Sequence, residues 1–536
     1  MKTKFLFILW CLCSLTISAQ NRYFVNQTKG NDSNDGKTWS KAFATIQPAL
    51  ENAKNKDEIW VASGLYLPTK KIYDTDSEGQ PTSDRYKAFV IPAGVKIYGG
   101  FPANAVDNTG MDKRDWKLNQ TILSGDLNKD DGKDFTGMQD NVYCVVYLFN
   151  ASETTVIDGF TITGGNMNLL PVPMRMIRGS GICAISEGSF ASSPTLNNLI
   201  IEGNFSTCGG AGFSNESFGD ASPKISNTII RNNKSGEYGG GFANYGNKKS
   251  SPVLENVIIS GNQAFRGGGL WCISEAVETS PVMTNVLICG NLAENRAGGA
   301  YIQSYAGMVK PVITNVTISG NKSGTNGGGL FCLAGDDSTP IGISSPTLRN
   351  TVICGNKALA YPNYLNMGSA SSIEDIQHSQ IEELMVFHGT AGNYDYDPKF
   401  VKPIDADFAP TAEGDYRPGK GSPLINQGNN GFVTTTVDLD GNPRIFDTTV
   451  DIGAYECQEL LIAGISETIA EKRIWAEAGN LIVRVDKPTV VRIYSIEGML
   501  VQQVNVGEGT RTISLPAGFY IVSLNNETQG KVYVSR

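Results

Sequence analysis

The stretch Pro252-Val253-Leu254-Glu255-Asn256-Val257-Ile258-Ile259-Ser260-Gly261-Asn262 decides the fold, because its pattern occurs six times between Pro194 and Asn356. Each copy starts with proline, and asparagine follows four residues later, isoleucine seven later and a second asparagine ten later. The isoleucines are Ile201, Ile230, Ile259, Ile288, Ile318 and Ile353, and the second asparagines are Asn204, Asn233, Asn262, Asn291, Asn321 and Asn356. A repeat of this length is typical of a solenoid.

The residues of the repeat indicate which kind of solenoid this is. The copies consist mainly of Val, Ile, Thr, Asn, Ser and Gly, which favour strands and turns over helices. The pattern predicts a strand over Val253–Asn262 with Leu254, Val257 and Ile259 inside, ended by Ser260-Gly261-Asn262, and another strand from Gly267. Strands this short, with no crossover helix between them, can only stack on the same strand of the next copy. We therefore expect an all-β protein built on a right-handed parallel β-helix.

In such a helix each repeated position forms a column, with about 4.8 Å between successive coils. The isoleucine column is expected to fill the interior. Stacked asparagines at a bend can bond to one another along the column and accept a left-handed backbone. Glycine clusters such as Gly239–Gly241 and Gly267–Gly269 are expected at the other corner, where a β-carbon does not fit. These columns are interpreted as scaffold and not as ligand sites.

Composition and charge exclude some classes of function. The chain has 536 residues with 60 glycines and 18% charged residues, which suits a β solenoid of several domains. A net charge of −9 without basic clusters argues against a nucleic-acid partner. The N-terminus resembles a signal peptide, because Lys2 and Lys4 precede the apolar run Phe5–Leu15 and small residues lead to a cut before Gln20. We therefore expect an exported chain with no transmembrane segment after cleavage.

Eight cysteines remain after that cut. Cys289 and Cys354 share one repeat position and Cys272 and Cys332 share another, but each pair skips one coil. Two coils span about 9.6 Å, beyond the roughly 7 Å between α-carbons that a disulfide can bridge. We interpret these cysteines as small buried hydrophobic residues and expect no metal site, since CxxC pairs are absent and the chain has only two histidines.

Strings before and after the regular copies resemble a known family. Ile59-Trp60-Val61-Ala62-Ser63-Gly64-Leu65-Tyr66 and Tyr98-Gly99-Gly100-Phe101 resemble the pectin-lyase-like right-handed β-helix surface proteins of Bacteroidetes, which are similar in repeat style to polymorphic outer-membrane proteins. Residues 42–53 are expected to form a helix that caps the first coil. Val156–Gly164 is interpreted as an early coil with Phe160 and Ile162 inside.

The stretch before Glu456 resembles the closing signature of that family, called choice-of-anchor Q, at Asp438-Leu439-Asp440-Gly441-Asn442-Pro443-Arg444 and Asp451-Ile452-Gly453-Ala454-Tyr455-Glu456. It departs from the family at Asn426-Gln427, where relatives carry Asp-Ala. Asp438, Asp440 and Asp447 suggest calcium binding, because hard cations prefer clustered oxygens. Turn formation by Asp-Gly is the alternative that we favour, so no cofactor is expected.

The C-terminal residues alternate as short strands between Gly and Pro turns and predict a small antiparallel β-sandwich. Ile493-Tyr494-Ser495-Ile496-Glu497-Gly498 and Leu515-Pro516-Ala517-Gly518-Phe519-Tyr520 resemble the C-terminal sorting domain of the type IX secretion system, which implies that machinery as a partner and a cell-surface or extracellular location. The alternative is an immunoglobulin-like accessory module. The expected boundaries are 1–19 for the signal peptide, 20–192 for the cap and first coils, 193–357 for the regular repeats, 358–457 for the irregular last coils and closing segment, 458–473 for a linker and 474–536 for the sandwich.

Catalytic residues are not identifiable. A lyase needs a carboxylate cluster with a basic Arg or Lys, and a hydrolase needs paired aspartates, and neither set stands out in the coils. Arg231, Arg266 and Arg296 near the asparagine corner are candidates for a basic ligand surface, with Arg175 and Arg178 in a long loop, although solvated surface is the simpler interpretation.

Two classes of function stay open. The first, which the sequence favours, is a non-enzymatic adhesin or scaffold that contacts glycans or a host surface. The second is a polysaccharide lyase or glycoside hydrolase. Irregular loops would distinguish them, and the candidates are Asn166–Gly179, Asp336–Ser344 and Tyr361–Asn393.

Overall fold

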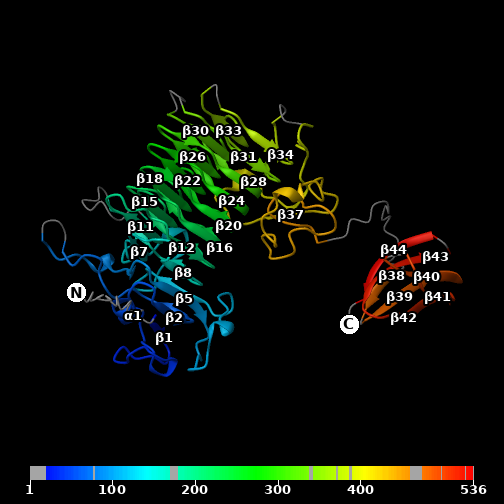
Figure 1. The fold of residues 1–536 in the computed structure, drawn as a ribbon, viewed down its shortest axis with the longest axis horizontal. Coiled ribbons are helices and arrows are strands. Elements are labelled where there is room, and N and C mark those ends of the chain that lie inside the picture. The colour runs from blue at the N-terminus through cyan, green and yellow to red at the C-terminus, as the bar shows by residue number, and fades with distance from the viewer. Residues whose placement is uncertain are drawn as a thin grey trace, which may run out of the picture. The chain divides into compact units, whose positions relative to one another are not determined.

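The computed structural model describes residues 20–75, 79–169, 179–336, 342–369, 372–384, 389–458, 474–477, 479–496, 498–525 and 527–534. The chain forms two compact units, Met1–Gln458 and Glu459–Arg536. It is all-β, and the first unit is a parallel β-helix while the second consists of antiparallel sheets (Figure 1). The signal peptide predicted at 1–19 lies outside the described residues, as does most of the predicted linker.

One coil of the helix contains up to four strands. The coil that follows Pro252 has β20 (Val253–Ser260), β21 (Gln263–Arg266), β22 (Leu270–Ser274) and β23 (Glu278–Thr279). Each strand pairs in parallel with its counterpart in the next coil, so that Ile259 aligns with Ile288. The predicted end at Ser260 is confirmed, but the short strand β21 was not predicted.

Stacked coils produce four parallel sheets. The seventeen-stranded sheet, called the long sheet here, comprises β1 (Arg22–Val25), β2 (Glu58–Ala62), β3 (Gly64–Tyr66), β5 (Lys96–Phe101), β6 (Thr121–Ser124), β8 (Val156–Asp158), β9 (Thr161–Thr163), β12 (Thr195–Asn197), β13 (Ile200–Glu202), β16 (Lys224–Arg231), β20, β24 (Val282–Cys289), β28 (Val312–Ser319), β31 (Thr347–Arg349), β32 (Val352–Cys354), β34 (Asp375–Gln377) and β35 (Gln380–Ile381). The nine-stranded sheet comprises β4 (Phe89–Ile91), β7 (Val146–Phe149), β11 (Ile182–Ser186), β15 (Phe213–Ser217), β18 (Phe242–Gly246), β22, β26 (Ala300–Ser304), β30 (Leu330–Ala334) and β33 (Tyr364–Met367). Two smaller sheets contain β10 (Asn166–Met167), β14 (Phe205–Ser206), β17 (Lys234–Ser235), β21, β25 (Leu292–Arg296) and β29 (Lys322–Ser323), and β19 (Lys249–Ser250), β23 and β27 (Met308–Val309).

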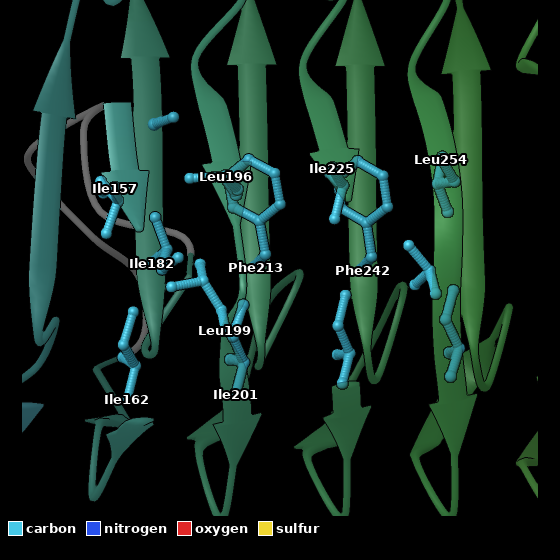
Figure 2. Packing of buried hydrophobic residues seen from close by; sticks show 14 of the residues in the cluster. Ile157, Ile162, Ile182, Leu196, Leu199, Ile201, Phe213, Ile225, Phe242 and Leu254 are labelled. Carbon is cyan, nitrogen blue, oxygen red and sulfur yellow. The ribbon is translucent and has the colours of Figure 1, made fainter. Parts of the chain in front are cut away.

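The interior is filled by columns of aliphatic and aromatic side chains. All six repeat isoleucines have 0% exposure. Figure 2 shows one side chain per coil in a row from Ile157 to Leu254, and Phe213 and Phe242 in adjacent coils. Those two rings stack with centroids 4.8 Å apart, which is close to the spacing of successive coils. Phe160 and Ile162 of the predicted early coil are also buried.

The two asparagine columns have different structures. The first, which includes Asn227 and Asn256, lies within the long sheet at φ of 49° and 55°. The second column does not adopt the left-handed backbone that the sequence analysis allowed for it. Its side chains are instead buried, and each amide bonds to the next. Asn233 donates through Nδ2 and its backbone N–H to Asn262 Oδ1, both at 3.0 Å, and the same pair of bonds joins the other members.

The left-handed residue explains which strand residues point inward. Leu254 and Val257 are both fully buried although they are three residues apart, which strict alternation in a strand forbids. Asn256 lies between them and is skipped in the register with β16, so the chain shifts by one residue.

The glycine corner packs against the asparagine ladder, since a β-carbon on Gly269 would lie 2.7 Å from the carbonyl oxygen of Gly299 and 3.0 Å from Asn291 Nδ2.

The N-terminal helix is shorter than predicted. Helix α1 spans Gln47–Asn52 and not residues 42–53, and a separate turn of 3-10 helix covers Trp39–Lys41. Pro48 lies in the first turn of α1, where its missing N–H and its ring are tolerated, and it would break a helix that began at Ala42. Ala49 and Leu50 pack into the coil interior.

The closing segment, residues 395–457, covers the outer face of the long sheet. It contains β36 (Phe400–Lys402) and β37 (Asp415–Pro418), which pair antiparallel. Its Phe400, Tyr416 and Ile452 pack on Cys289 and Cys354. Those two cysteines therefore point outward from the long sheet and are buried by this cover, whereas Cys272 and Cys332 point into the coil interior. Cys272, Cys289, Cys332 and Cys354 are free thiols, and burial raises the pKa of the Cys289 and Cys354 thiols to about 12.

The second unit contains two antiparallel sheets. One holds β38 (Ile474–Glu477), β39 (Asn480–Val485) and β42 (Gly509–Ser514), and the other β40 (Thr489–Ser495), β41 (Leu500–Val506), β43 (Gly518–Leu524) and β44 (Glu527–Val534). Leu481, Val491, Ile493 and Val522 from both sheets form one buried core. Within the described parts of the chain, no helix is long and apolar enough to cross a membrane.

Candidate ligand-binding cleft

A cleft of about 570 Å³ lies where the last coils meet the closing segment. One wall comes from the corner of the last coils at Asn356, Lys357 and Asn363, and from Gln380, Glu382 and Glu383 around β35. The other comes from Asp395–Pro398, Phe400 and Pro403–Ala406. The carboxylates that line the cleft are Glu382, Glu383, Asp395, Asp397 and Asp405. Tyr396, which also lines the cleft, is 52% exposed.

Backbone contacts fix several of these side chains. Glu382 Oε2 accepts a bond from the Gly355 N–H at 2.6 Å and one from Asn363 Nδ2 at 3.2 Å. Gln380 is 1% exposed and donates to the carbonyl oxygen of Tyr396 at 2.8 Å. Among the described residues, Gln380 Oε1 has no hydrogen-bond partner, and a buried acceptor of this kind is costly unless water or a ligand satisfies it. The cleft is therefore a preformed polar site.

The basic side chains near the cleft are paired. Lys357 forms an ion pair with Asp407, and Lys322 Nζ lies 3.1 Å from the same carboxylate. The two lysines lower the pKa of Asp407, and the hydrogen bond that Lys357 donates to Asp407 raises the pKa of Lys357. Lys357 is thus held protonated, which is unfavourable for a catalytic base.

The arginines suggested as a basic surface do not form one stripe. Arg266 and Arg296 align in neighbouring strands beyond the asparagine corner, whereas Arg231 precedes the corner on β16 and aligns with Ser260. Arg231 Nε also lies 2.6 Å from Glu202, so its charge is neutralised. Arg231 and the pair Arg266 and Arg296 therefore lie on opposite sides of the bend. Arg175 and Arg178 lie outside the described residues.

The aspartates suggested as a calcium site do not cluster. Asp438 is 1% exposed, and its carboxylate accepts three backbone N–H bonds, from Asp440, Asn442 and Glu456. Asp440 pairs with Arg417, with Nη2 and Oδ1 2.8 Å apart. Asp447 lies in a turn at a φ of 66°. The first two carboxylates therefore organise the closing segment.

Sequence reasoning located part of the cleft but not its chemistry. The segment Tyr361–Asn393 was one of three candidate irregular loops, but it contains β33, β34 and β35, which pair in parallel with the preceding coil. It contributes Pro362, Asn363 and Glu382 among others to the cleft. The string Asp395-Tyr396-Asp397-Pro398 was the missed signal, because it places two carboxylates and an aromatic ring together where the repeat decays. Nothing in the repeat itself indicates that residues 395–406 fold back against Asn356.

No family model matches this sequence, and no curated protein matches it. Similar solved structures include the pectate lyase Pel9A, at 13% identity and a TM-score of 0.41, over 82% of this chain and 97% of that one. A rhamnogalacturonan lyase has 12% identity and a TM-score of 0.33, over 71% and 90% of the two chains. A structure of XylC with xylose has 11% identity and a TM-score of 0.30, over 81% and 98%. At these values the resemblance carries no inference about activity.

Proposed function

We propose that this protein is an exported surface β-helix that binds neutral glycans through the cleft without cleaving them. The observation that carries the proposal is the arrangement of five carboxylates around a half-exposed tyrosine in a 570 Å³ cleft. Sugar hydroxyl groups donate strong bonds to carboxylates, and the apolar face of a sugar ring packs on an aromatic side chain. An anionic glycan would be repelled by this lining.

Binding without turnover is favoured over a lyase. Elimination needs an unpaired basic side chain at the sugar, and the lysine at this cleft is paired with Asp407. A glycoside hydrolase is the alternative to be tested, because two suitably spaced carboxylates suffice for that reaction.

The binding test uses purified protein and a panel of neutral and acidic polysaccharides in affinity electrophoresis. Tyr396→Ala and Asp395→Asn should each weaken the binding of the neutral ligand about tenfold, which corresponds to roughly 1.4 kcal/mol. Glu413→Gln, an exposed carboxylate of the closing segment outside the cleft lining, is the matched control and should bind normally. Equal binding by all variants would refute the site. New reducing ends or unsaturated products would show an enzyme instead.

Export and surface delivery are the second part of the proposal. They are supported by the signal-peptide pattern of residues 2–19 and by the strings around Ile493 and Leu515 that resemble a type IX sorting domain. We propose that the second unit is a sorting domain and that the secretion machinery is its partner. The apolar core of the second unit contains residues of that unit alone. Deleting the second unit therefore leaves the core of the coils intact.

The sorting test compares full-length protein with a chain that ends at Gln458. The truncated chain should accumulate in the periplasm as a folded protein with the melting temperature of the first unit. Equal surface signal from both forms after cell fractionation would refute the sorting role and favour an accessory module.

A further inference from the structure

A second, smaller groove lies on the outer face of the long sheet, away from the carboxylate cleft. It has a volume of about 240 Å³ and is bounded by Trp116 and Lys117 on one side and by the turn Val437–Gly441 on the other. Its floor is formed by the first asparagine column at Asn198, Asn227 and Asn256. No residue lines both this groove and the cleft described above.

The floor amides are fixed in position. The positive φ at Asn227 and Asn256 turns both side chains to the same side of the sheet, about 4.8 Å apart. Asn256 Nδ2 donates to Asn227 Oδ1 at 3.2 Å, and Asn227 Nδ2 donates to Asn197 Oδ1 at 3.3 Å. An amide nitrogen has two N–H donors, and these bonds use one of them. The second donor of each amide is available to a ligand in the groove.

The wall of the groove is also preorganised. The backbone next to Trp116 is anchored, because the Asp115 N–H donates to the carbonyl oxygen of Gly100 and the Lys117 N–H donates to Asp115 Oδ1, both at 2.9 Å. Gly100 has a φ of 89°, and a β-carbon there would lie 2.8 Å from the Trp116 Cα, so this contact requires glycine. The indole ring is half-buried and flanks the amide floor.

The charge of the groove is set by Lys117. The carboxylate of Asp438 is buried and bonded to backbone N–H groups, and that of Asp440 is bonded to Arg417. Lys117 is exposed, lies 5.5 Å from the Trp116 ring centre and has no ion-pair partner among the described residues. Among the lining residues, Lys117 is thus the charged group that is both exposed and without an ion-pair partner, so it presents a positive charge to a ligand, in contrast to the carboxylate cleft.

We propose that this groove binds one acidic sugar residue of a glycan, bearing a carboxylate or a sulfate. The sugar ring packs on Trp116, its hydroxyl oxygens accept bonds from Asn227 and Asn256, and its anionic group pairs with Lys117. The site is independent of the proposed function of the cleft, since it uses other residues and selects the opposite charge.

The experiment measures binding of methyl glucuronide, glucose 6-sulfate and methyl glucoside to the full chain by saturation-transfer NMR. At low salt both acidic sugars should bind about tenfold more tightly than methyl glucoside, or only one of them if the site distinguishes carboxylate from sulfate. Lys117→Met should remove this preference, and Trp116→Ala should remove the binding of both acidic sugars at the groove. Lys248 is an exposed lysine between β18 and β19, so Lys248→Met is the matched control and should behave as wild type.

Each other outcome overturns the inference. Absence of saturable binding by wild type excludes the site, and unchanged binding by Trp116→Ala places the sugar elsewhere. Thermal melts of each variant establish that it is folded. The cleft variant Tyr396→Ala should leave the binding of the acidic sugars unchanged. Failure of the groove and failure of the proposed function are therefore distinguishable.

Discussion

The regular coils and the closing segment solve the same problem in opposite ways. Both regions bury polar groups, the coils at the bend between two strands and the closing segment on the outer face of the long sheet. The coils use a neutral, repeated group: each asparagine of the second column satisfies the next, as Asn233 does with Asn262. The closing segment uses single charged groups, with Arg444 at 1% exposure beside Glu456 and Asp451.

The difference shows in how completely the hydrogen bonds of the asparagine ladder and of the buried Arg444 are satisfied. Along the coils, every ladder amide from Asn204 to Asn356 donates to the next oxygen at 2.9 to 3.1 Å. In the closing segment Arg444 Nη2 donates to the carbonyl oxygens of Asp451 and Gly453, but Nε and Nη1 have no hydrogen-bond partner among the described residues. Buried charges of this kind contribute less stability than a satisfied neutral network. The comparison predicts that substitutions inside the coils lower the stability strongly and that the stability of the closing segment depends on pH.

The largest effect is expected from a charge in the coil interior. Ile259→Asp would place a carboxylate between Ile230 and Ile288 with no partner, at a cost of about 4 kcal/mol or more. Glu255→Ala, an exposed position on the same strand, should change the free energy of unfolding by no more than about 0.5 kcal/mol. Denaturant titration measures both. Equal midpoints would contradict the inward position of the isoleucine column.

A smaller loss is expected from breaking the asparagine ladder. Asn262→Leu removes the acceptor for the backbone N–H and Nδ2 of Asn233, and leaves the carbonyl oxygen of Ile230 without its amide donor. The expected cost is about 2–3 kcal/mol, because these groups are buried. Asn247→Leu makes the same chemical change at an exposed position and should be close to neutral. If the two variants unfold at the same denaturant concentration, the ladder does not stabilise the coils.

The same contrast explains what the sequence could predict. The environment of Ile259 and Asn262 recurs in all six copies of the repeat. A period in the sequence therefore predicts columns of side chains in the structure. It also identified Asn256 as a column member, but its left-handed backbone became clear only from the register. The cleft depends on contacts that occur once, such as Gln380 with Tyr396 and Lys357 with Asp407. A contact between distant residues that is not repeated leaves no periodic signal, and for that reason the carboxylate cleft was not predicted.

The smallest effect is expected in the closing segment, from pH. Burial raises the pKa of Glu456 from 4.5 to about 8 and that of Asp451 from 3.8 to about 6, and each carboxylate also repels its neighbour. A carboxyl group with a raised pKa in the folded state holds more protons when folded than when unfolded. Folding is therefore favoured by these groups at low pH, and this contribution is lost as pH rises from about 3.8 to about 8. The melting temperature of the first unit should fall by a few degrees across that window.

Glu456→Gln separates this effect from general acid–base behaviour. The amide keeps the shape of the side chain and cannot ionise, so the variant should lose most of the decline between pH 7 and 8, where Asp451 is already largely ionised. Glu413→Gln, an exposed carboxyl group in the same segment, should keep the wild-type profile. Asp438 and Arg444 face the same buried network and are unchanged in both variants. A wild-type melting temperature that rises from pH 6 to 8, or an identical decline in both variants, would show that Glu456 is ionised without cost because Arg444 compensates it fully. The buried carboxylate of Glu456 would then resemble the asparagine ladder in being fully compensated by its neighbours.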